Sequence, residues 1–237
     1  MSASKTPSVD GRAPPVEADD AVDAFLAKLD AAPKPARGGP GRLIFALDAT
    51  ASREPTWDRA MDAQAAMFDA AAALGGLETQ LLFYRGFREC KASRWTADAA
   101  ALRRVMTGVR CLAGRTQIGR VLQHVAKSAK AGRVDAAVFV GDMMEEDVDA
   151  LGEDAGRLGL LGVPVFIFHE GGDPVAARSF QHIATLTGGA YAPLDDASAD
   201  KLRALLAGVA AYAAGGRAAL EDYARRAPGA RLLLPGR

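Results

Sequence analysis

The stretch from Leu43 to Ser52 reads LIFALDATAS, and it decides the class of fold. Its first five residues are all apolar, which is typical of a strand buried on both faces of a sheet. Oxygen-bearing side chains follow where this strand should end, at Asp48, Thr50 and Ser52. Strands of this kind belong to parallel sheets, which bind ligands in the loops at the carboxyl ends of their strands. The stretch therefore predicts an α/β domain and marks a first candidate site.

The rest of the chain alternates between apolar runs and helical stretches. Further strands are predicted at residues 79–84, 136–140 and 163–168, with a short hairpin partner between 87 and 95 and a last strand at Tyr191. Helices are predicted at residues 55–74, 96–106, 116–131 and 147–161, from Pro174 onward, and at 199–226. This alternation predicts a doubly wound, mostly parallel sheet flanked by helices, in one domain at residues 41–226.

The two ends of the chain differ from this domain in composition. Residues 1–40 are rich in Pro, Gly and Ala, which predicts a flexible segment. Within it, residues 19–30 have the spacing of a short amphipathic helix, with Phe25 and Leu26 on its apolar face. Two interpretations stay open, because such a helix can dock on its own domain or bind another protein. Residues 227–237 are predicted to form a C-terminal tail.

Composition excludes several classes of protein. The 29 Lys and Arg balance the 29 Asp and Glu, so no net charge attracts nucleic acid or an anionic membrane. No apolar run approaches the roughly 20 residues that span a bilayer, and the polar start of the chain does not resemble a signal peptide. The two cysteines, Cys90 and Cys111, are too few for a disulfide framework or a Cys-rich zinc site. We expect a cytoplasmic protein that binds neither nucleic acid nor membranes.

Two further oxygen donors stand in the same kind of position as the first three. Thr116 lies between two glycines before a predicted helix, and Asp142 follows the predicted strand at 136–140. Carboxylates and hydroxyls are hard ligands that suit Mg²⁺ or Mn²⁺ better than zinc. The predicted ligand set is Asp48, Thr50, Ser52, Thr116 and Asp142.

These motifs resemble those of the von Willebrand factor A (vWA) family and its metal-ion-dependent adhesion site (MIDAS). The family motif D-x-S-x-S is matched from Asp48 to Ser52, with Thr50 in place of the first serine. The motif G-x-T-x-x-G-x-x-L is matched around Thr116. The third motif, usually Thr-Asp-Gly, reads Gly-Asp-Met around Asp142. The resemblance covers about residues 41–213 and implies a six-stranded sheet of the doubly wound kind.

The resemblance also implies a role for each residue. Ser52 and Thr50 would bind Mg²⁺, Mn²⁺ or Ca²⁺ directly, and Thr116 directly or through water. Asp48 and Asp142 would hold metal-bound waters. An acidic side chain of a partner protein would complete the coordination. The resemblance implies a stand-alone intracellular module without catalytic activity, working in a multi-protein machine such as one built on an AAA+ ATPase.

Several neighbours of these motifs are candidates for contact with a partner. Arg53, Arg115 and Met143 flank the metal motifs, although surface arginines and a packed methionine are equally consistent with the sequence. Phe25 and Leu26 join them if the N-terminal helix reaches another protein.

Two other functions remain as alternatives. A scaffold without a working metal site is favoured by Met143, which departs from the family pattern. A metal-dependent phosphohydrolase with Asp48 as nucleophile would need a second acid where Thr50 stands, so an enzyme is not expected. Residues 145–147 (Glu-Glu-Asp) are predicted to be the solvated start of a helix, and a role in tuning metal affinity stays open as an alternative.

Overall fold

The computed structural model describes residues 39–72, 76–194 and 199–226, together with Phe25, Lys28 and Ala32. Most of the predicted N-terminal segment at 1–40, including Leu26, lies outside the described residues. The predicted tail at 227–237 also lies outside them.

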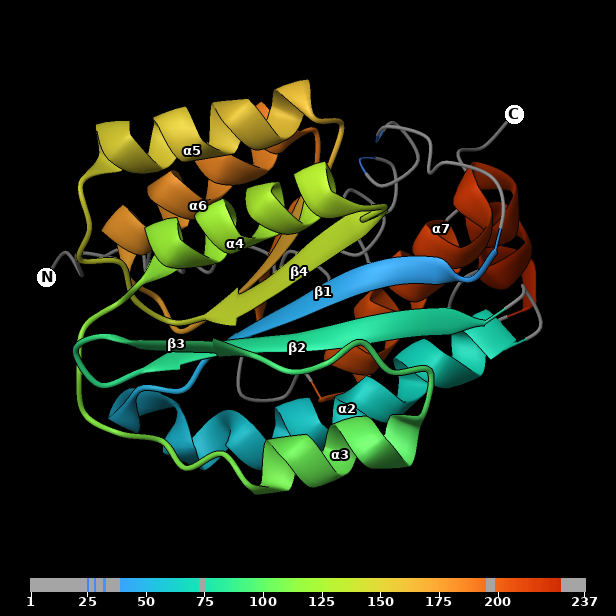
Figure 1. Cartoon of the computed structure of the whole chain (residues 1–237), viewed down its shortest axis with the longest axis horizontal. Coiled ribbons are helices and arrows are strands. Elements are labelled where there is room, and N and C mark those ends of the chain that lie inside the picture. The colour runs from blue at the N-terminus through green and yellow to red at the C-terminus, as the bar shows by residue number, and fades with distance from the viewer. Residues whose placement is uncertain are drawn as a thin grey trace, which may run out of the picture.

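The described residues contain one six-stranded sheet with the order β3-β2-β1-β4-β5-β6 (Figure 1). The strands are β1 (Gly41–Asp48), β2 (Leu77–Arg85), β3 (Glu89–Ala92), β4 (Ala136–Gly141), β5 (Val165–Glu170) and β6 (Tyr191–Leu194). All neighbouring strands pair in parallel except β3, which runs antiparallel to β2 at one edge. The doubly wound, mostly parallel sheet predicted from the sequence is confirmed.

Strand β1 lies in the middle of the sheet and contributes to two separate cores. Leu43, Phe45 and Leu47 pack into the core on one face, whereas Ile44 and Ala46 pack into the core on the other. All five side chains are fully buried. Successive side chains of a strand point to opposite faces, so only an uninterrupted apolar run can occupy this position.

The helices form a layer on each face of the sheet (Figure 1). They are α2 (Glu54–Ala72), α3 (Ala99–Thr107), α4 (Ile118–Ala131), α5 (Val148–Leu160), α6 (Pro174–Thr187) and α7 (Ala199–Arg226), preceded by the 3₁₀ turn η1 (Ala51–Arg53). Helices α2, α3 and α7 cover one core, and α4, α5 and α6 cover the other. Within the described residues, no helix has the length and apolar character needed to cross a membrane.

The order of the strands creates a crevice at the end of β1. The chain goes from β1 to β2 on one side and later places β4 on the other side of β1. Because α2 and α5 then cover opposite faces, the loops that follow β1 and β4 diverge from each other. In open α/β sheets, such a switch point is where ligands bind.

Phe25 belongs to the core of this domain. Its side chain is 1% exposed, and its ring centroid lies 6.0 Å from that of Phe166 and 5.5 Å from that of Phe168. The predicted role of Phe25 in binding a partner is therefore not supported by its position. Of the two interpretations left open by the sequence, this position matches docking on the chain's own domain.

Candidate metal centre

Asp48 is the last residue of β1, and its side chain is fully buried. Its Oδ1 accepts a hydrogen bond from the backbone N–H of Thr50 at 2.7 Å, and its Oδ2 accepts one from the Tyr84 hydroxyl at 2.8 Å. Burial raises the pKa of Asp48, and the charge of Asp142 raises it further, against the effect of both hydrogen bonds. The folded state thus holds this carboxylate in a position where added positive charge would stabilise it.

Thr50 and Ser52 present their hydroxyls side by side after β1. Their oxygens lie 3.1 Å apart. The backbone N–H of Arg53 donates to the carbonyl of Thr50 at 3.0 Å, which closes a tight turn and brings alternate residues together. Thr50 is nearly buried, whereas Ser52 is exposed. The three oxygen-bearing residues of the first motif thus form one contiguous group.

Asp142 follows β4 and lies close enough to Asp48 for their charges to interact. Gly141, directly before it, leaves room for the ring of Phe139, since a Cβ at that position would lie 2.7 Å from this ring. The Oδ1 atom of Asp142 is buried, and no hydrogen-bond donor among the described residues reaches it. An unpaired buried carboxylate oxygen beside a second carboxylate is the arrangement that a cation stabilises.

Thr116 is buried before α4 and is linked to the loop after β4. Its hydroxyl accepts a hydrogen bond from the backbone N–H of Glu145 at 3.0 Å, and its own N–H donates to the Glu145 carboxylate at 3.2 Å. Glu146 accepts hydrogen bonds from the first N–H groups of α4, those of Ile118 at 2.5 Å and Gly119 at 2.9 Å. These contacts hold the Thr116 motif and the Asp142 loop together.

The prediction that residues 145–147 are a solvated helix start is wrong in part, because Glu145 is exposed as predicted but neither Glu145 nor Glu146 starts α5. Asp147 does cap α5, since its side chain accepts from the N–H of Ala150. Glu145 and Glu146 instead bind the N-terminal end of α4, because the parallel sheet brings that end next to the β4 loop. Carboxylates are favoured there by the helix dipole.

A small cavity of about 180 Å³ opens beside these loops. Its lining residues are Ser52, Arg53, Thr56, Arg59, Asp142, Glu170, Gly171 and Leu194. Of the five predicted ligands, Ser52 and Asp142 line this cavity, whereas Asp48, Thr50 and Thr116 are buried and are not among its lining residues.

The residues predicted to contact a partner differ in their exposure to solvent. Arg53 is 1% exposed and forms a buried ion pair with Glu170, so it is not presented at the surface as the sequence suggested. Glu170 ends β5, and nothing in the local sequence around Arg53 indicates this pairing. Met143 is 44% exposed and Arg115 is exposed, so both can be reached by a partner.

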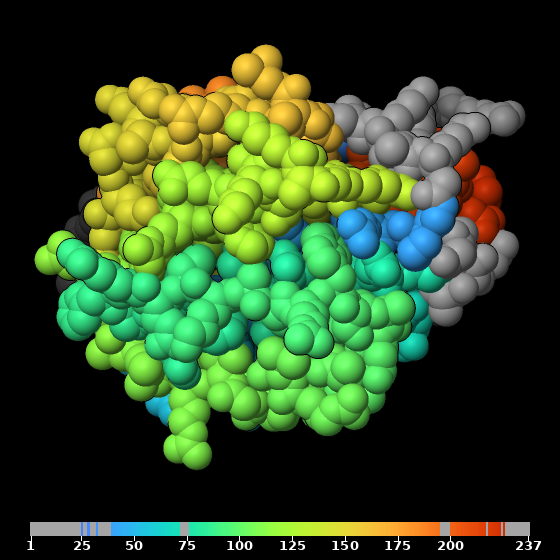
Figure 2. Space-filling model, viewed as in Figure 1, coloured from blue at the N-terminus to red at the C-terminus, as the bar shows by residue number. Residues whose placement is uncertain are grey.

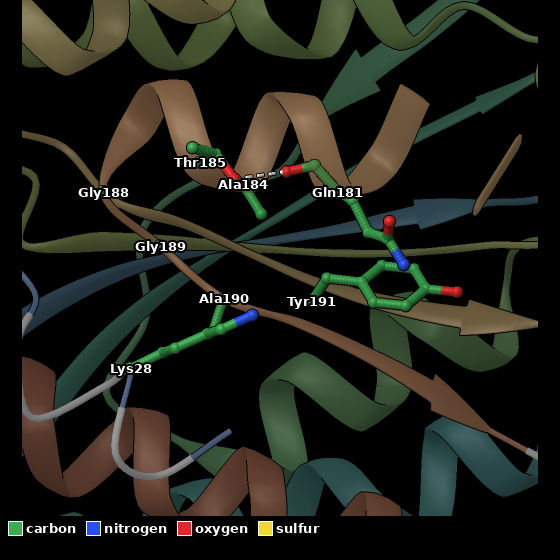
Figure 3. A pocket seen from close by; sticks show the side chains of 8 residues that line it. All are labelled: Lys28, Gln181, Ala184, Thr185, Gly188, Gly189, Ala190 and Tyr191. Carbon is green, nitrogen blue, oxygen red and sulfur yellow. Dashed lines mark hydrogen bonds between the residues drawn. The ribbon is translucent and has the colours of Figure 1, made fainter. Parts of the chain in front are cut away.

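A second cavity, of about 430 Å³, lies away from these residues at the end of α6 and the start of β6 (Figure 3). Lys28, Gln181 and Tyr191 are among its lining residues. The Tyr191 hydroxyl is hydrogen-bonded to Nδ1 of His169 at 2.9 Å.

Among the described residues, no group of three or more His, Cys, Asp or Glu side chains could hold a metal ion. The candidate centre therefore depends on hydroxyls as well as carboxylates.

Comparison with known proteins identifies the architecture. No family model and no curated protein matches the sequence. The solved vWA domain of SpRpn10 does match the structure, with a TM-score of 0.58 over 70% of this chain and 94% of that chain, at 16% identity. A vWA protein from Catenulispora acidiphila has the same TM-score over 75% of this chain and 44% of that chain, at 15% identity. The chain has the von Willebrand factor A fold.

One further vWA structure carries a metal. Proximal thread matrix protein 1 from the mussel byssus was solved with a zinc-occupied MIDAS motif. It matches with a TM-score of 0.56 over 73% of this chain and 46% of that chain, at 12% identity. At this level of identity the match establishes the fold alone.

Two residues that support the candidate centre of this vWA fold were missed by the sequence analysis. Tyr84 lies opposite Asp48 in the register of β1 and β2. Its position near the end of a predicted strand could have indicated from the sequence that its hydroxyl lies near Asp48. His169 holds the Asp142 loop, with its Nε2 3.1 Å from the Asp142 carbonyl. Burial lowers the pKa of His169, which favours the neutral ring. Its role depends on the pairing of β4 with β5, which no local pattern indicates.

Proposed function

We propose that this chain is a non-catalytic protein-binding module that uses a divalent cation to bind an acidic side chain of a partner protein. The cation is Mg²⁺, or Mn²⁺ or Ca²⁺ in its place. Its site is formed by Asp48, Thr50, Ser52, Thr116 and Asp142, which hold the cation directly or through metal-bound water.

One observation carries this proposal more than any other. The buried Oδ1 of Asp142 has no donor among the described residues, and burial, with a smaller contribution from the charge of Asp142, raises the pKa of nearby Asp48. Two carboxylates at adjoining strand ends destabilise each other unless positive charge lies between them. The paired hydroxyls of Thr50 and Ser52 supply the neutral oxygens that complete a hard-cation site.

The residues of the proposed site differ in exposure and therefore have different roles. Ser52 and Asp142 line the open cavity and are placed to meet both the cation and the incoming side chain. Asp48 lies beneath them with both oxygens hydrogen-bonded, so it supplies negative charge from behind. When bound, the cation would offer a coordination position to a carboxylate, which anchors the partner.

The buried position of Asp48 also argues against the phosphohydrolase alternative. A nucleophile must reach its substrate, whereas Asp48 is fully buried and both of its oxygens accept hydrogen bonds. We therefore propose a binding function and not an enzymatic one. The wider setting is proposed to be a multi-protein assembly in the cytoplasm, in which an AAA+ ATPase is one candidate partner.

Thermal melts with and without divalent metal test the site. A cation that binds only the folded protein stabilises it by about 2.7 kcal/mol at a hundredfold excess over its dissociation constant. We expect Mg²⁺ or Mn²⁺ to raise the melting temperature of the EDTA-treated protein, and Asp142→Asn and Ser52→Ala to abolish this rise.

Asp98→Asn is the matched control. Asp98 caps α3, away from the candidate centre, and asparagine caps helices equally well. The control should keep the full metal response. If Mg²⁺, Mn²⁺ and Ca²⁺ at millimolar concentrations all leave the wild-type melt unchanged, the metal-dependent function is wrong.

A metal-independent scaffold is the second candidate, and two observations favour it. The Thr116 hydroxyl already accepts a hydrogen bond from Glu145, and Met143 stands beside Asp142. Partner binding that ignores both EDTA and Asp142→Asn would support the scaffold.

A further inference from the structure

The turn between β2 and β3 and the loop between α3 and α4 form one surface beside the candidate metal centre. The N–H of Gly86 donates to the carbonyl of Leu112 at 3.4 Å, and the N–H of Arg115 donates to the carbonyl of Gly86 at 3.2 Å. Gly114 makes this contact possible, since a Cβ there would lie 2.0 Å from the Gly86 carbonyl oxygen. Figure 1 shows the two segments together at the left end of the molecule, where β1, β2 and β4 end.

This surface is continuous with the loop that carries the metal motif. The N–H of Leu112 donates to the carbonyl of Ala49 at 3.1 Å, and the N–H of Ala49 donates to the carbonyl of Tyr84 at 2.9 Å. Ala49 stands between Asp48 and Thr50. This surface therefore borders the metal motif on the side of β2, where a partner segment that extends from the metal centre can contact it.

Two large apolar side chains are exposed here. Phe87 is 74% exposed at the tip of the turn, and Leu112 is 46% exposed on the loop. Aromatic side chains that stand in water at the tip of a turn contribute nothing to the core, but they are enriched in protein interfaces. In Figure 2 the green segments from this part of the chain make up the lower left of the surface.

Three arginines lie on the same turn and loop as these apolar side chains. Arg88, Arg110 and Arg115 are exposed, and none forms a salt bridge with another described residue. Neighbouring Arg85 differs, because it is paired with Glu89 at 2.9 Å. The loop at residues 108–117 contains no Asp or Glu. Glu145 approaches it at the N–H of Thr116 and Glu54 lies near Cys111, but neither forms a salt bridge with the three arginines.

We propose that these five residues, Phe87, Arg88, Arg110, Leu112 and Arg115, form a specificity surface for an acidic segment of the partner protein that also contains an apolar side chain. We name it the arginine flank. It rests on the proposed function, in which one carboxylate of the segment binds the cation. Further carboxylates of the segment then pair with the arginines, and its apolar side chain covers Phe87 and Leu112. Arginine suits this task because its planar group binds carboxylates in a bidentate manner.

Selection of random peptides displayed on phage tests this proposal on the full-length protein in Mg²⁺. We expect the enriched peptides to combine more than one Asp or Glu with Leu, Ile, Phe or Met. The affinity of a synthetic enriched peptide should fall about tenfold with Arg110→Glu/Arg115→Glu, because two attractions become repulsions. It should also weaken as salt is added, because exposed charges are screened.

A matched variant controls for net charge. Arg94→Glu/Arg178→Glu makes the same change of charge at exposed positions outside the flank that also form no salt bridge with a described residue, and it should alter the affinity by less than about twofold. Phe87→Ser/Leu112→Ser should weaken binding without a change of charge. Each variant is first shown to melt like the wild type.

The outcomes separate this inference from the function on which it rests. Peptides without acidic and apolar enrichment, no enrichment at all, or equal losses in the flank and control variants would overturn the arginine flank. Binding that needs Mg²⁺ and Asp142 but not the flank would leave only the metal-dependent function. Binding that needs the flank but ignores EDTA and Asp142→Asn would overturn the metal-dependent function and keep the flank as a contact surface.

Discussion

We expect the hydroxyl of Tyr84 to contribute far more to the free energy of unfolding than the hydroxyl of Tyr212, although both tyrosines are buried. The Tyr84 hydroxyl donates to the Asp48 carboxylate at 2.8 Å, and its ring stacks on Phe139 with centroids 6.2 Å apart. Tyr84→Phe keeps the ring and its stacking and removes only the donor. The variant therefore measures the one hydrogen bond that supports Asp48 from β2.

The expected loss follows from the charge and burial of the pair. Hydrogen bonds to charged groups contribute about 1.5–3 kcal/mol to stability, and burial leaves no water to replace this donor. For a domain of this size, that loss lowers the melting temperature by roughly 3–12 °C. Urea unfolding monitored by circular dichroism, in EDTA at neutral pH, measures the change in the free energy of unfolding.

Tyr212→Phe is the control. The Tyr212 hydroxyl is buried but has no hydrogen-bond partner among the described residues, while its ring packs edge-on against Phe166. Removing an unpaired buried hydroxyl should leave stability unchanged or slightly increase it. If the two variants unfold alike, or if Tyr84→Phe costs less than about 0.5 kcal/mol, the Tyr84 hydroxyl does not stabilise a buried, charged Asp48 and the reasoning is refuted.

The penalty of Tyr84→Phe should also depend on pH. Burial raises the pKa of Asp48 in the folded state. Protonation of Asp48 therefore stabilises the fold below the unfolded pKa of about 3.9, and this stabilisation is lost as the pH rises through the pKa of the folded state. Loss of a donor to the carboxylate raises the folded pKa further. The penalty is therefore expected to be largest at neutral pH and to shrink in acid, where a protonated Asp48 needs the donor less.

Three further predictions test the fold and its thiols. Phe25→Ala should destabilise the protein by about 3 kcal/mol in urea unfolding, whereas Phe87→Ala, at an exposed ring, should change stability by less than about 0.5 kcal/mol; equal effects would contradict the docking of Phe25. Gly114→Ala should cost about 1–3 kcal/mol, because its Cβ meets the Gly86 carbonyl, whereas Gly156→Ala in open space on α5 should stabilise. Burial raises the pKa of Cys111 to about 11, so iodoacetamide at pH 8 should alkylate it roughly a hundredfold more slowly than free cysteine, and a free-cysteine rate would refute this burial.

The sequence alone determined the class of fold and the place of the first motif. The apolar run from Leu43 to Leu47 can be satisfied only in a strand covered on both faces, and that constraint is local. The oxygen-bearing residues after the strand then had to lie at the carboxyl edge of the sheet. The predicted set at Asp48, Thr50 and Ser52 is indeed contiguous in the structure. Whether these residues bind a metal stays a prediction.

Only the tertiary structure decided how the separate motifs meet. The pairing of β1 with β4 brings Asp142 to Asp48, and the packing of α4 beside the β4 loop ties Thr116 to Glu145. Strand pairing turned Arg53 from an expected surface residue into the buried partner of Glu170. These contacts join residues far apart in the sequence, and their free energy comes from pairing and burial that no local window contains. The sequence therefore determined which side chains lie at the edge of the sheet, and the packing of strands and helices determined which of them touch.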